Sequence, residues 1–71
     1  MKKEIEIYGF TFECKVKNCS IYVNLVDRPA EGSDVDAENY SWDAAEEISD
    51  LEADQFTLVE SGSGEYIFHI I

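Results

Sequence analysis

Carboxylates recur in the second half of the chain at a spacing that would bring them to one side of a helix. Asp43, Glu47, Asp50 and Asp54 stand at positions i, i+4, i+7 and i+11, and at about 100° per residue they fall in a sector of about 60°, beside Glu46. With a rise of about 1.5 Å per residue, the row would be about 16 Å long, with neighbouring carboxylates about 5–6 Å apart. That spacing resembles the phosphates of a nucleic acid. The row therefore predicts a surface that occupies a groove lined by lysine and arginine.

Three more acids and two aromatic residues precede this row. Exposed tryptophan and tyrosine beside charges are frequent in interfaces, so we include them in one predicted partner-binding set. For Trp42 a second interpretation stays open, in which its ring folds back over the sheet edge at the start of the helix. The predicted set is Asp34, Asp36, Glu38, Tyr40, Trp42, Asp43, Glu46, Glu47, Asp50 and Asp54.

The charge is divided along the chain. Residues 1–26 carry a net charge of +1, whereas residues 27–71 carry thirteen acids against the single cation Arg28, a net charge of −12. Solubility needs a net charge of only about 2–8 in magnitude in a small domain, and a larger field of one sign opposes compaction. We therefore expect a basic nucleic-acid-binding protein as partner, and no direct binding of nucleic acid or membrane. The alternative is an acidic face that only keeps the protein solvated.

Metal binding, cofactor binding and catalysis are not expected. Asp34 to Glu38 alternate as in a calcium loop, but Asn39 stands where that loop needs glycine and Ala45 where it needs glutamate. Two cysteines and one histidine fall short of a four-ligand zinc site. Catalytic carboxylates need a pocket that separates their pKa values, which a chain of 71 residues seldom builds.

The two cysteines flank a predicted turn and share one strand face. With a two-residue turn Cys14 and Cys19 would be diagonal neighbours, about 7–8 Å apart, and with a four-residue turn they would be directly opposed. We expect two reduced cysteines that act as small core residues. His69, in the last strand, is expected to be a structural or surface residue.

Size and composition indicate one folded domain, residues 1–71. Hydrophobic residues make up 45% of the chain and aromatic residues 13%, too many for a disordered acidic tail. No stretch approaches the roughly 20 apolar residues of a membrane span, and the N-terminus lacks the apolar core of a signal peptide. We expect a cytoplasmic protein.

Alternation of apolar and polar residues predicts a three-stranded β-meander over residues 3–26. A turn at Tyr8-Gly9 would oppose Ile7 to Phe10 and Ile5 to Phe12, and Gly9 supplies the positive φ that such a turn needs. A second turn, at Lys17-Asn18, would oppose three further pairs of inward residues. These pairs are Val16 with Cys19, Cys14 with Ile21 and Phe12 with Val23.

The remaining residues predict a loop, a helix and a hairpin. Residues 27–40, with Pro29 and Gly32, are typical of an acidic loop, in which a short helical turn near Val35–Tyr40 is an open alternative. Residues 41–54 predict an acidic helix with Ser41 or Asp43 as N-cap. Residues 56–71 predict a C-terminal β-hairpin in one of two registers. A Gly62-Ser63 turn would pair Leu58 with Ile67, and a five-residue loop would pair Leu58 with Phe68.

The element order βββ-α-ββ predicts an α+β fold. An antiparallel sheet of about five strands, with one helix packed on one face, buries the apolar sides of both elements.

Size, acidity and this small α+β layout, with the acidic run from Asp34 to Asp54, resemble the small phage-encoded inhibitors called anti-CRISPR proteins. Several of those proteins act as nucleic-acid mimics. The resemblance implies a non-enzymatic inhibitor that binds the positively charged nucleic-acid groove of a CRISPR effector, in the host cytoplasm. An acidic phage inhibitor of a restriction enzyme or another host DNA-binding protein is a related possibility.

A different class of function is a protein-interaction or assembly module without nucleic-acid mimicry. Such a module could be a monomer or a homodimer formed through an exposed strand edge. The C-terminal Ile70-Ile71 would then lie at that edge, since an apolar edge strand tends to pair with another chain.

Overall fold

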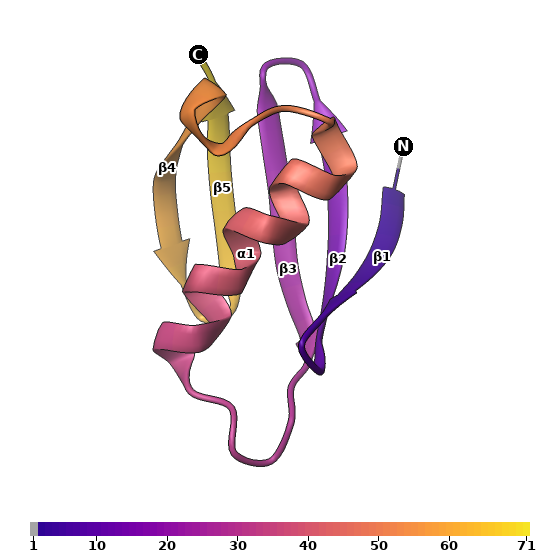
Figure 1. Ribbon diagram of the computed structural model, residues 1–71. Helices are drawn as coiled ribbons and strands as arrows, with labels where there is room; N and C mark the ends of the chain where they lie inside the picture. The colour runs from indigo at the N-terminus through magenta and orange to yellow at the C-terminus, as the bar shows by residue number, and fades with distance from the viewer. Residues whose placement is uncertain (1) are drawn as a thin grey trace.

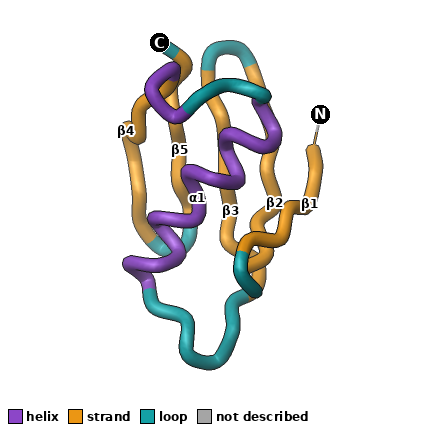
Figure 2. Tube along the Cα trace, in the orientation of Figure 1, coloured by secondary structure: helices purple, strands orange, loops and turns teal. Residues whose placement is uncertain are grey.

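Three strands, one long helix and two further strands make up the protein, in a computed structural model that describes residues 2–71 (Figure 1). The five strands form one antiparallel sheet in the order β1-β2-β3-β5-β4. The helix α1 runs diagonally across one face of that sheet (Figure 2). The predicted α+β class and element order are confirmed. The elements are β1 (Lys2–Ile7), β2 (Phe10–Lys17), β3 (Ser20–Asp27), α1 (Asp34–Ser49), η1 (Ala53–Gln55), β4 (Phe56–Gly62) and β5 (Glu65–Ile70).

The hydrophobic core lies between α1 and the sheet. Alternate residues of each strand point toward the helix, and the largest fully buried side chains include Phe12 and Phe68. The helix contributes only small buried residues, which lets its backbone lie close to the strands. The buried hydrophobic residues are Ile5, Phe10, Phe12, Cys14, Ile21, Val23, Ala37, Ala44, Ala45, Phe56, Tyr66 and Phe68.

The first hairpin has the predicted turn and register. Ile7 lies opposite Phe10 and Ile5 opposite Phe12. Tyr8 and Gly9 both have positive φ, at 48° and 86°. Two central residues with positive φ match the twist of the flanking strands, which is why short hairpins favour such turns.

The second turn lies one residue later than predicted. It consists of Asn18 and Cys19, because Lys17 pairs with Ser20 and Asn18 takes the left-handed conformation, at φ 56°. Asparagine tolerates that conformation better than lysine does. The pairing therefore shifts by two residues, so that Cys14 faces Val23, and the inward face is preserved. Cys14 is buried as expected, but the expectation of a buried Cys19 is wrong, because Cys19 is exposed in the turn.

The C-terminal hairpin pairs Leu58 with Phe68, which is one of the two predicted registers. This register does not arise from the predicted five-residue loop. A two-residue turn joins the strands at Ser63 and Gly64, with φ of 52° and 81°. A register shift between Leu58 and Glu60 then restores the pairing. This bulge leaves Val59 about half exposed at the edge of the sheet.

The helix begins and ends earlier than predicted. It spans Asp34–Ser49, so the predicted bounds of 41–54 and the predicted loop over 27–40 are both wrong. Ser33 is the N-cap, and its hydroxyl accepts a hydrogen bond from the backbone N–H of Asp36 at 3.1 Å. Acids in the first turn favour this start, because the helix N-terminus carries a partial positive charge. At the other end Asp50 takes the left-handed conformation and stops the helix.

We expect Ser33→Ala to lower the free energy of unfolding by about 1 kcal/mol, the usual effect of removing an N-cap side chain. Ser33 is exposed, so the substitution removes the cap without emptying any part of the core. Urea denaturation followed by circular dichroism measures the change. Ser61→Ala is the control, since Ser61 is an exposed serine in β4 and its loss should cost less than about 0.5 kcal/mol. Equal stability of the two variants would mean that Ser33 does not cap the helix.

The C-terminal isoleucines do not form a strand edge. The edge strands are β1 and β4, whereas β5 lies between β3 and β4. Ile70 is half-buried in this inner strand, and the N–H of Ile71 donates to the carbonyl oxygen of Gln55 at 2.9 Å. These residues therefore do not supply the strand edge considered for an assembly module, because β5 has a hydrogen-bonded neighbour on each side.

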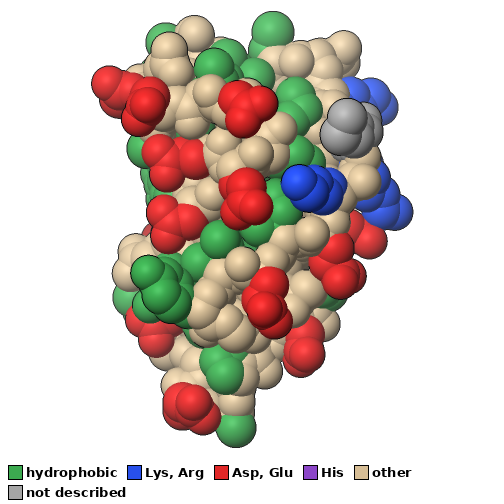
Figure 3. All heavy atoms as spheres, turned by 45° about the vertical axis from the view of Figure 1, so that its right-hand side comes forward, with side chains coloured by type: hydrophobic (Ala, Val, Ile, Leu, Met, Phe, Trp, Pro, Cys, Tyr) green, Lys and Arg blue, Asp and Glu red, His purple; other side chains and the backbone are tan. Residues whose placement is uncertain are grey.

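The two faces of the sheet differ in charge. Helix α1 contains six acids and no lysine or arginine. Lys2, Lys15 and Lys17 lie on the opposite face, which no element among residues 2–71 covers, and there the glutamates at positions 4, 6 and 13 balance their charge. There the Lys15 Nζ lies 5.4 Å from the ring centre of Tyr22. Figure 3 shows cationic side chains gathered at the upper right, beside the start of β1, and acidic side chains over the rest of the visible face. Within residues 2–71, no helix has the length and apolar character of a membrane span.

Candidate functional site

Three of the predicted partner-binding acids form an outer acidic face on α1. At about 100° per residue, Asp36, Asp43 and Glu47 fall in a sector of about 40°, whose centre lies about 125° from the centre of the buried side of the helix. Asp43 and Glu47 are exposed, and Asp36 is partly exposed. They extend over eleven residues of helix, which corresponds to about 16 Å. The outer acidic face therefore has the predicted length, although it begins and ends earlier in the sequence.

The other acids of the predicted row lie elsewhere. Asp50 ends the helix, and Asp54 lies in η1, so neither continues the helical spacing. Glu46 is partly buried, and its Oε2 accepts a hydrogen bond from the backbone N–H of Ala53 at 2.9 Å. The predicted continuous row from 43 to 54 is wrong, because the left-handed residue at position 50 redirects the chain.

Tyr40 and Trp42 pack on opposite halves of the sheet. The Trp42 ring stacks on Phe56, with centroids 5.4 Å apart, and meets Phe68 edge-on at 4.8 Å. The Tyr40 ring lies 5.4 Å from that of Phe10. The interpretation in which Trp42 folds back over the sheet is confirmed. Both residues are partly exposed.

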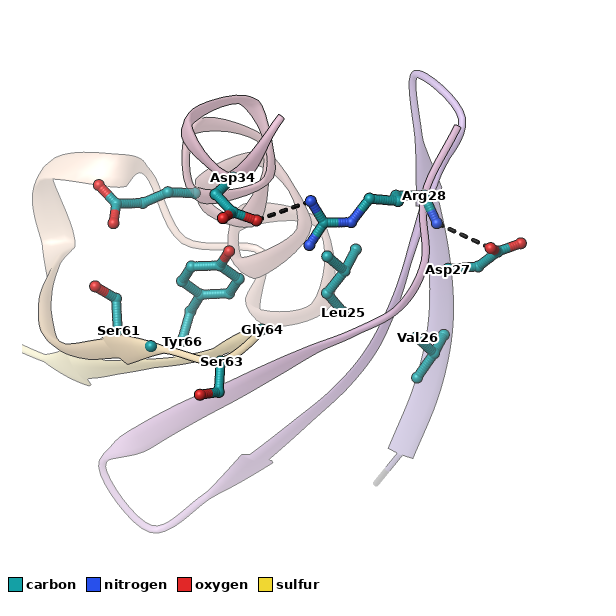
Figure 4. A pocket seen from close by; sticks show the side chains of 11 residues that line it. Leu25, Val26, Asp27, Arg28, Asp34, Ser61, Ser63, Gly64 and Tyr66 are labelled. Carbon is teal, nitrogen blue, oxygen red and sulfur yellow. Dashed lines mark hydrogen bonds and ion pairs between the residues drawn. The ribbon is translucent and has the colours of Figure 1, made fainter. Parts of the chain in front are cut away.

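Asp34 and Glu38 line a separate cleft at the start of the helix (Figure 4). This cleft has a volume of about 520 Å³ and lies between α1, the end of β3 and the turn that joins β4 to β5. At its mouth the Arg28 Nη1 lies 2.8 Å from the Asp34 Oδ1. The cleft thus combines one cation with two carboxylates from successive turns of the helix.

The cleft exists because β3 continues beyond its last contact with β5. The Leu25 N–H donates to the carbonyl oxygen of Gly64 at 2.7 Å. The next residues of β3 remain beside β2, where Asp27 pairs with Thr11, while the chain of β5 turns back into β4. The two parts of the sheet separate at this point, and the first turns of α1 lie above the gap.

Tyr66 forms the inner wall of the cleft. Only 5% of this residue is exposed, and Figure 4 shows its ring pointing from the sheet toward Asp34. Burial raises the pKa of Tyr66 above its ordinary value, Asp34 and Glu38 raise it further, and Arg28 opposes the shift. The phenol is therefore protonated at neutral pH, so its hydroxyl can donate one hydrogen bond and accept others.

Sequence reasoning did not identify Arg28, Tyr66 or the turn of residues 61–64 as parts of a site. Arg28 was visible as the single cation after residue 26, and the turn as a hairpin signal. Nothing in the local sequence places them beside Asp34 and Glu38. Their proximity depends on the position of β5 next to β3 and on the early start of the helix.

The surroundings of Cys14 disfavour the ionised form of its thiol. Burial, with the carboxylates of Glu47 and Glu13, raises the pKa of the Cys14 thiol from 9.0 to about 12, so it stays protonated at neutral pH. Among residues 2–71, no group of three or more His, Cys, Asp or Glu side chains could hold a metal ion.

Comparison with protein-family models, with curated proteins and with solved structures finds no match for this chain.

Proposed function

We propose that this protein is a non-enzymatic inhibitor that binds the positively charged nucleic-acid groove of a CRISPR effector or a similar host-defence protein. The outer acidic face acts as the nucleic-acid mimic, and the protein acts in the cytoplasm of the host cell. The observation that carries the proposal is the set of three outward carboxylates on a helix that contains no lysine or arginine. Such a helix replaces the counterions of a basic groove with fixed charges.

The energetics of the helix support a binding role. Asp43 and Glu47 are four residues apart, and like charges at this spacing destabilise a helix by about 0.2–0.5 kcal/mol. A lysine at either position would instead form a favourable pair and keep the surface soluble. The packed side of the helix fixes the carboxylates in space, because Ala37, Ala44 and Ala45 are fully buried against the sheet. A rigid row of like charges loses little entropy when it enters a groove.

A capture experiment tests this proposal. The immobilised protein is exposed to a bacterial host lysate at about 50 mM salt, and bound proteins are then challenged with short duplex DNA or with about 300 mM salt. We expect both to release the specific partner, because DNA competes for the same groove and the affinity falls steeply with ionic strength. The triple variant Asp36→Lys, Asp43→Lys, Glu47→Lys should capture at least about tenfold less partner.

The matched control is the triple variant Glu4→Lys, Glu6→Lys, Glu65→Lys. It changes the net charge by the same amount at exposed positions of β1 and β5, away from the helix. Capture by this control should stay within about twofold of the unmodified protein. Equal losses in both variants would show a response to total charge alone. A partner that duplex DNA does not displace would also contradict the mimicry.

A further inference from the structure

The Tyr66 hydroxyl lacks a hydrogen-bond partner within the protein. Only 5% of Tyr66 is exposed. No hydrogen bond joins its hydroxyl to another group in residues 2–71. No side-chain nitrogen or oxygen of the described residues is both fully enclosed and unpaired, so the Tyr66 hydroxyl is open to solvent. The phenol points toward the cleft and Asp34 (Figure 4). The cleft therefore contains a polar group that a ligand is able to satisfy.

Glu38 provides a second group without a partner. Its side chain lines the cleft and is partly buried, and it forms no ion pair or hydrogen bond within residues 2–71. Asp34 and Glu38 are four residues apart on α1, so they lie on the same side of the helix at about 5–6 Å between Cβ atoms. Two carboxylates and one phenol thus converge on a single opening.

The ion pair between Arg28 and Asp34 shows that a guanidinium group fits at the mouth of the cleft. The Arg28 guanidinium reaches Asp34 from the mouth of the cleft, at 2.8 Å, and leaves Glu38 and Tyr66 without a partner. The Asp34 side chain is 91% exposed, so this ion pair is a surface interaction. Such pairs contribute little to stability, and an incoming group is able to displace them readily.

We infer that the cleft binds the guanidinium group of an arginine side chain from the basic partner. This inference deepens the proposed function and rests on it. A guanidinium presents five N–H donors in one plane, which match two carboxylates and a phenol oxygen, and its face stacks on an aromatic ring. The charged residues that line the cleft are Asp27, Arg28, Asp34 and Glu38, a net charge of −2, which disfavours an anion. The volume of about 520 Å³ leaves room for the adjoining backbone of the partner.

NMR titration of the ¹⁵N-labelled protein with blocked amino acids tests the inference. The probe is N-acetyl-arginine methylamide, and N-acetyl-citrulline methylamide is its neutral isostere. We expect the arginine probe to give saturable shifts in the amide signals of residues 25–28, 34–38 and 61–66. The citrulline probe should give none, and N-acetyl-lysine methylamide should bind at least about threefold more weakly. Equal binding of all three probes, or shifts spread over every acidic segment, would overturn the inference.

Substitutions then test the individual groups. Glu38→Gln and Tyr66→Phe should each weaken binding of the arginine probe by about three- to tenfold. Asp43→Asn is the control for charge, since it lies on the outer acidic face and should change the affinity by less than about twofold. The spectra themselves show whether each variant is folded. Unchanged affinity in both cleft variants would overturn the inference.

Removing Arg28 should have the opposite effect. Arg28→Ala deletes the internal competitor for Asp34 and should strengthen binding of the arginine probe by up to about fivefold, the equivalent of a surface ion pair. Lys17→Ala removes the same charge from the uncovered side of the sheet and should leave the affinity within about twofold. Weaker binding after removal of Arg28 would mean that Arg28 itself contacts the ligand as a needed group, which contradicts the inference.

Partner capture separates this inference from the proposed function. If the variants Glu38→Gln and Tyr66→Phe capture the partner normally while the lysine triple variant does not, the cleft inference fails alone. If the cleft binds the arginine probe while the lysine triple variant captures the partner normally, the proposed mimicry fails alone.

Discussion

Replacing Phe68 by alanine should lower the free energy of unfolding by about 3–5 kcal/mol, the usual cost of removing a large buried aromatic side chain. Phe68 is fully buried in β5. Its ring lies 4.8 Å from that of Trp42 and 5.3 Å from that of Phe56, so the substitution removes the shared contact of this aromatic cluster. A domain of this size has a total stability of about 4–11 kcal/mol. The variant should therefore be unfolded, or close to unfolding, at 37 °C.

Urea denaturation followed by far-ultraviolet circular dichroism measures this loss without relying on Trp42, whose surroundings change in the variant. The matched control is Ile67→Ala. Ile67 is the preceding residue of the same strand, but it points to the uncovered face and is only partly buried. It should cost less than about 1.5 kcal/mol. Similar losses at positions 67 and 68 would contradict the assignment of Phe68 to the core between sheet and helix.

The second large effect is a loss of stability at alkaline pH. The pKa of Cys14 is about 12 in the folded protein and 9.0 in its ordinary state. Below pH 9 both folded and unfolded chains keep this proton, so the stabilisation is fully present there. Between pH 9 and 12 the unfolded chain releases the proton and the folded chain does not, which favours unfolding. Each pH unit in this window costs about 1.4 kcal/mol, so about 2–3 kcal/mol should be lost by pH 11.

Tyr66 acts in the same direction at still higher pH, because its folded pKa is also raised above the ordinary value of 10.0. Urea denaturation at pH 8, 9, 10 and 11 measures the combined slope. Cys14→Ala will be less stable at pH 8 because it leaves a cavity, but its stability should fall less steeply above pH 9. Cys19→Ala removes the exposed thiol and should keep the original slope. The same slope in the Cys14 and Cys19 variants would contradict the role assigned to Cys14.

Labelling with a thiol reagent gives an independent check of the same assignment. Cys19 is exposed and Cys14 is buried. The folded protein should therefore react rapidly at one thiol, and the second should react only after urea is added.

The sheet could be predicted largely from the sequence because its signals are local. Alternating residues in β1 and β2 define an inward face, and Gly9 fixes the first turn, so the register of Ile5 with Phe12 followed directly. The second turn was placed one residue too early, because turns at Lys17-Asn18 and at Asn18-Cys19 keep the same residues inward. The bulge near Val59 could not be predicted, since it depends on how β4 pairs with the whole length of β5.

The start of the helix was missed because its buried face is unusually small. Ala37, Ser41, Ala44 and Ala45 fill that face, and small residues give a weak periodic signal in hydropathy. Pro29 and Gly32 close by also favour a loop. The side-chain cap from Ser33 was the informative feature. With the correct start, Asp36 joins Asp43 and Glu47, and Asp34 and Glu38 turn toward the cleft.

The cleft itself lies beyond sequence reasoning. Arg28 follows β3, Tyr66 belongs to β5, and Glu38 belongs to the helix. Only the sheet order, in which β5 lies beside β3, brings them together. These residues lie in separate segments, so no motif or spacing along the chain marks them as parts of one site.

The division of charge between the two faces of the sheet also affects how the molecule approaches a partner. Helix α1 carries six acids, whereas the far side of β1 and β2 carries three lysines and three glutamates, so negative charge is concentrated on the helix side and gives the protein an electric dipole moment that crosses the sheet. In the field of a positively charged surface, such a dipole experiences a torque that turns the helix toward that surface before contact. A larger fraction of collisions is then correctly oriented, which raises the association rate above that of an evenly charged protein with the same net charge.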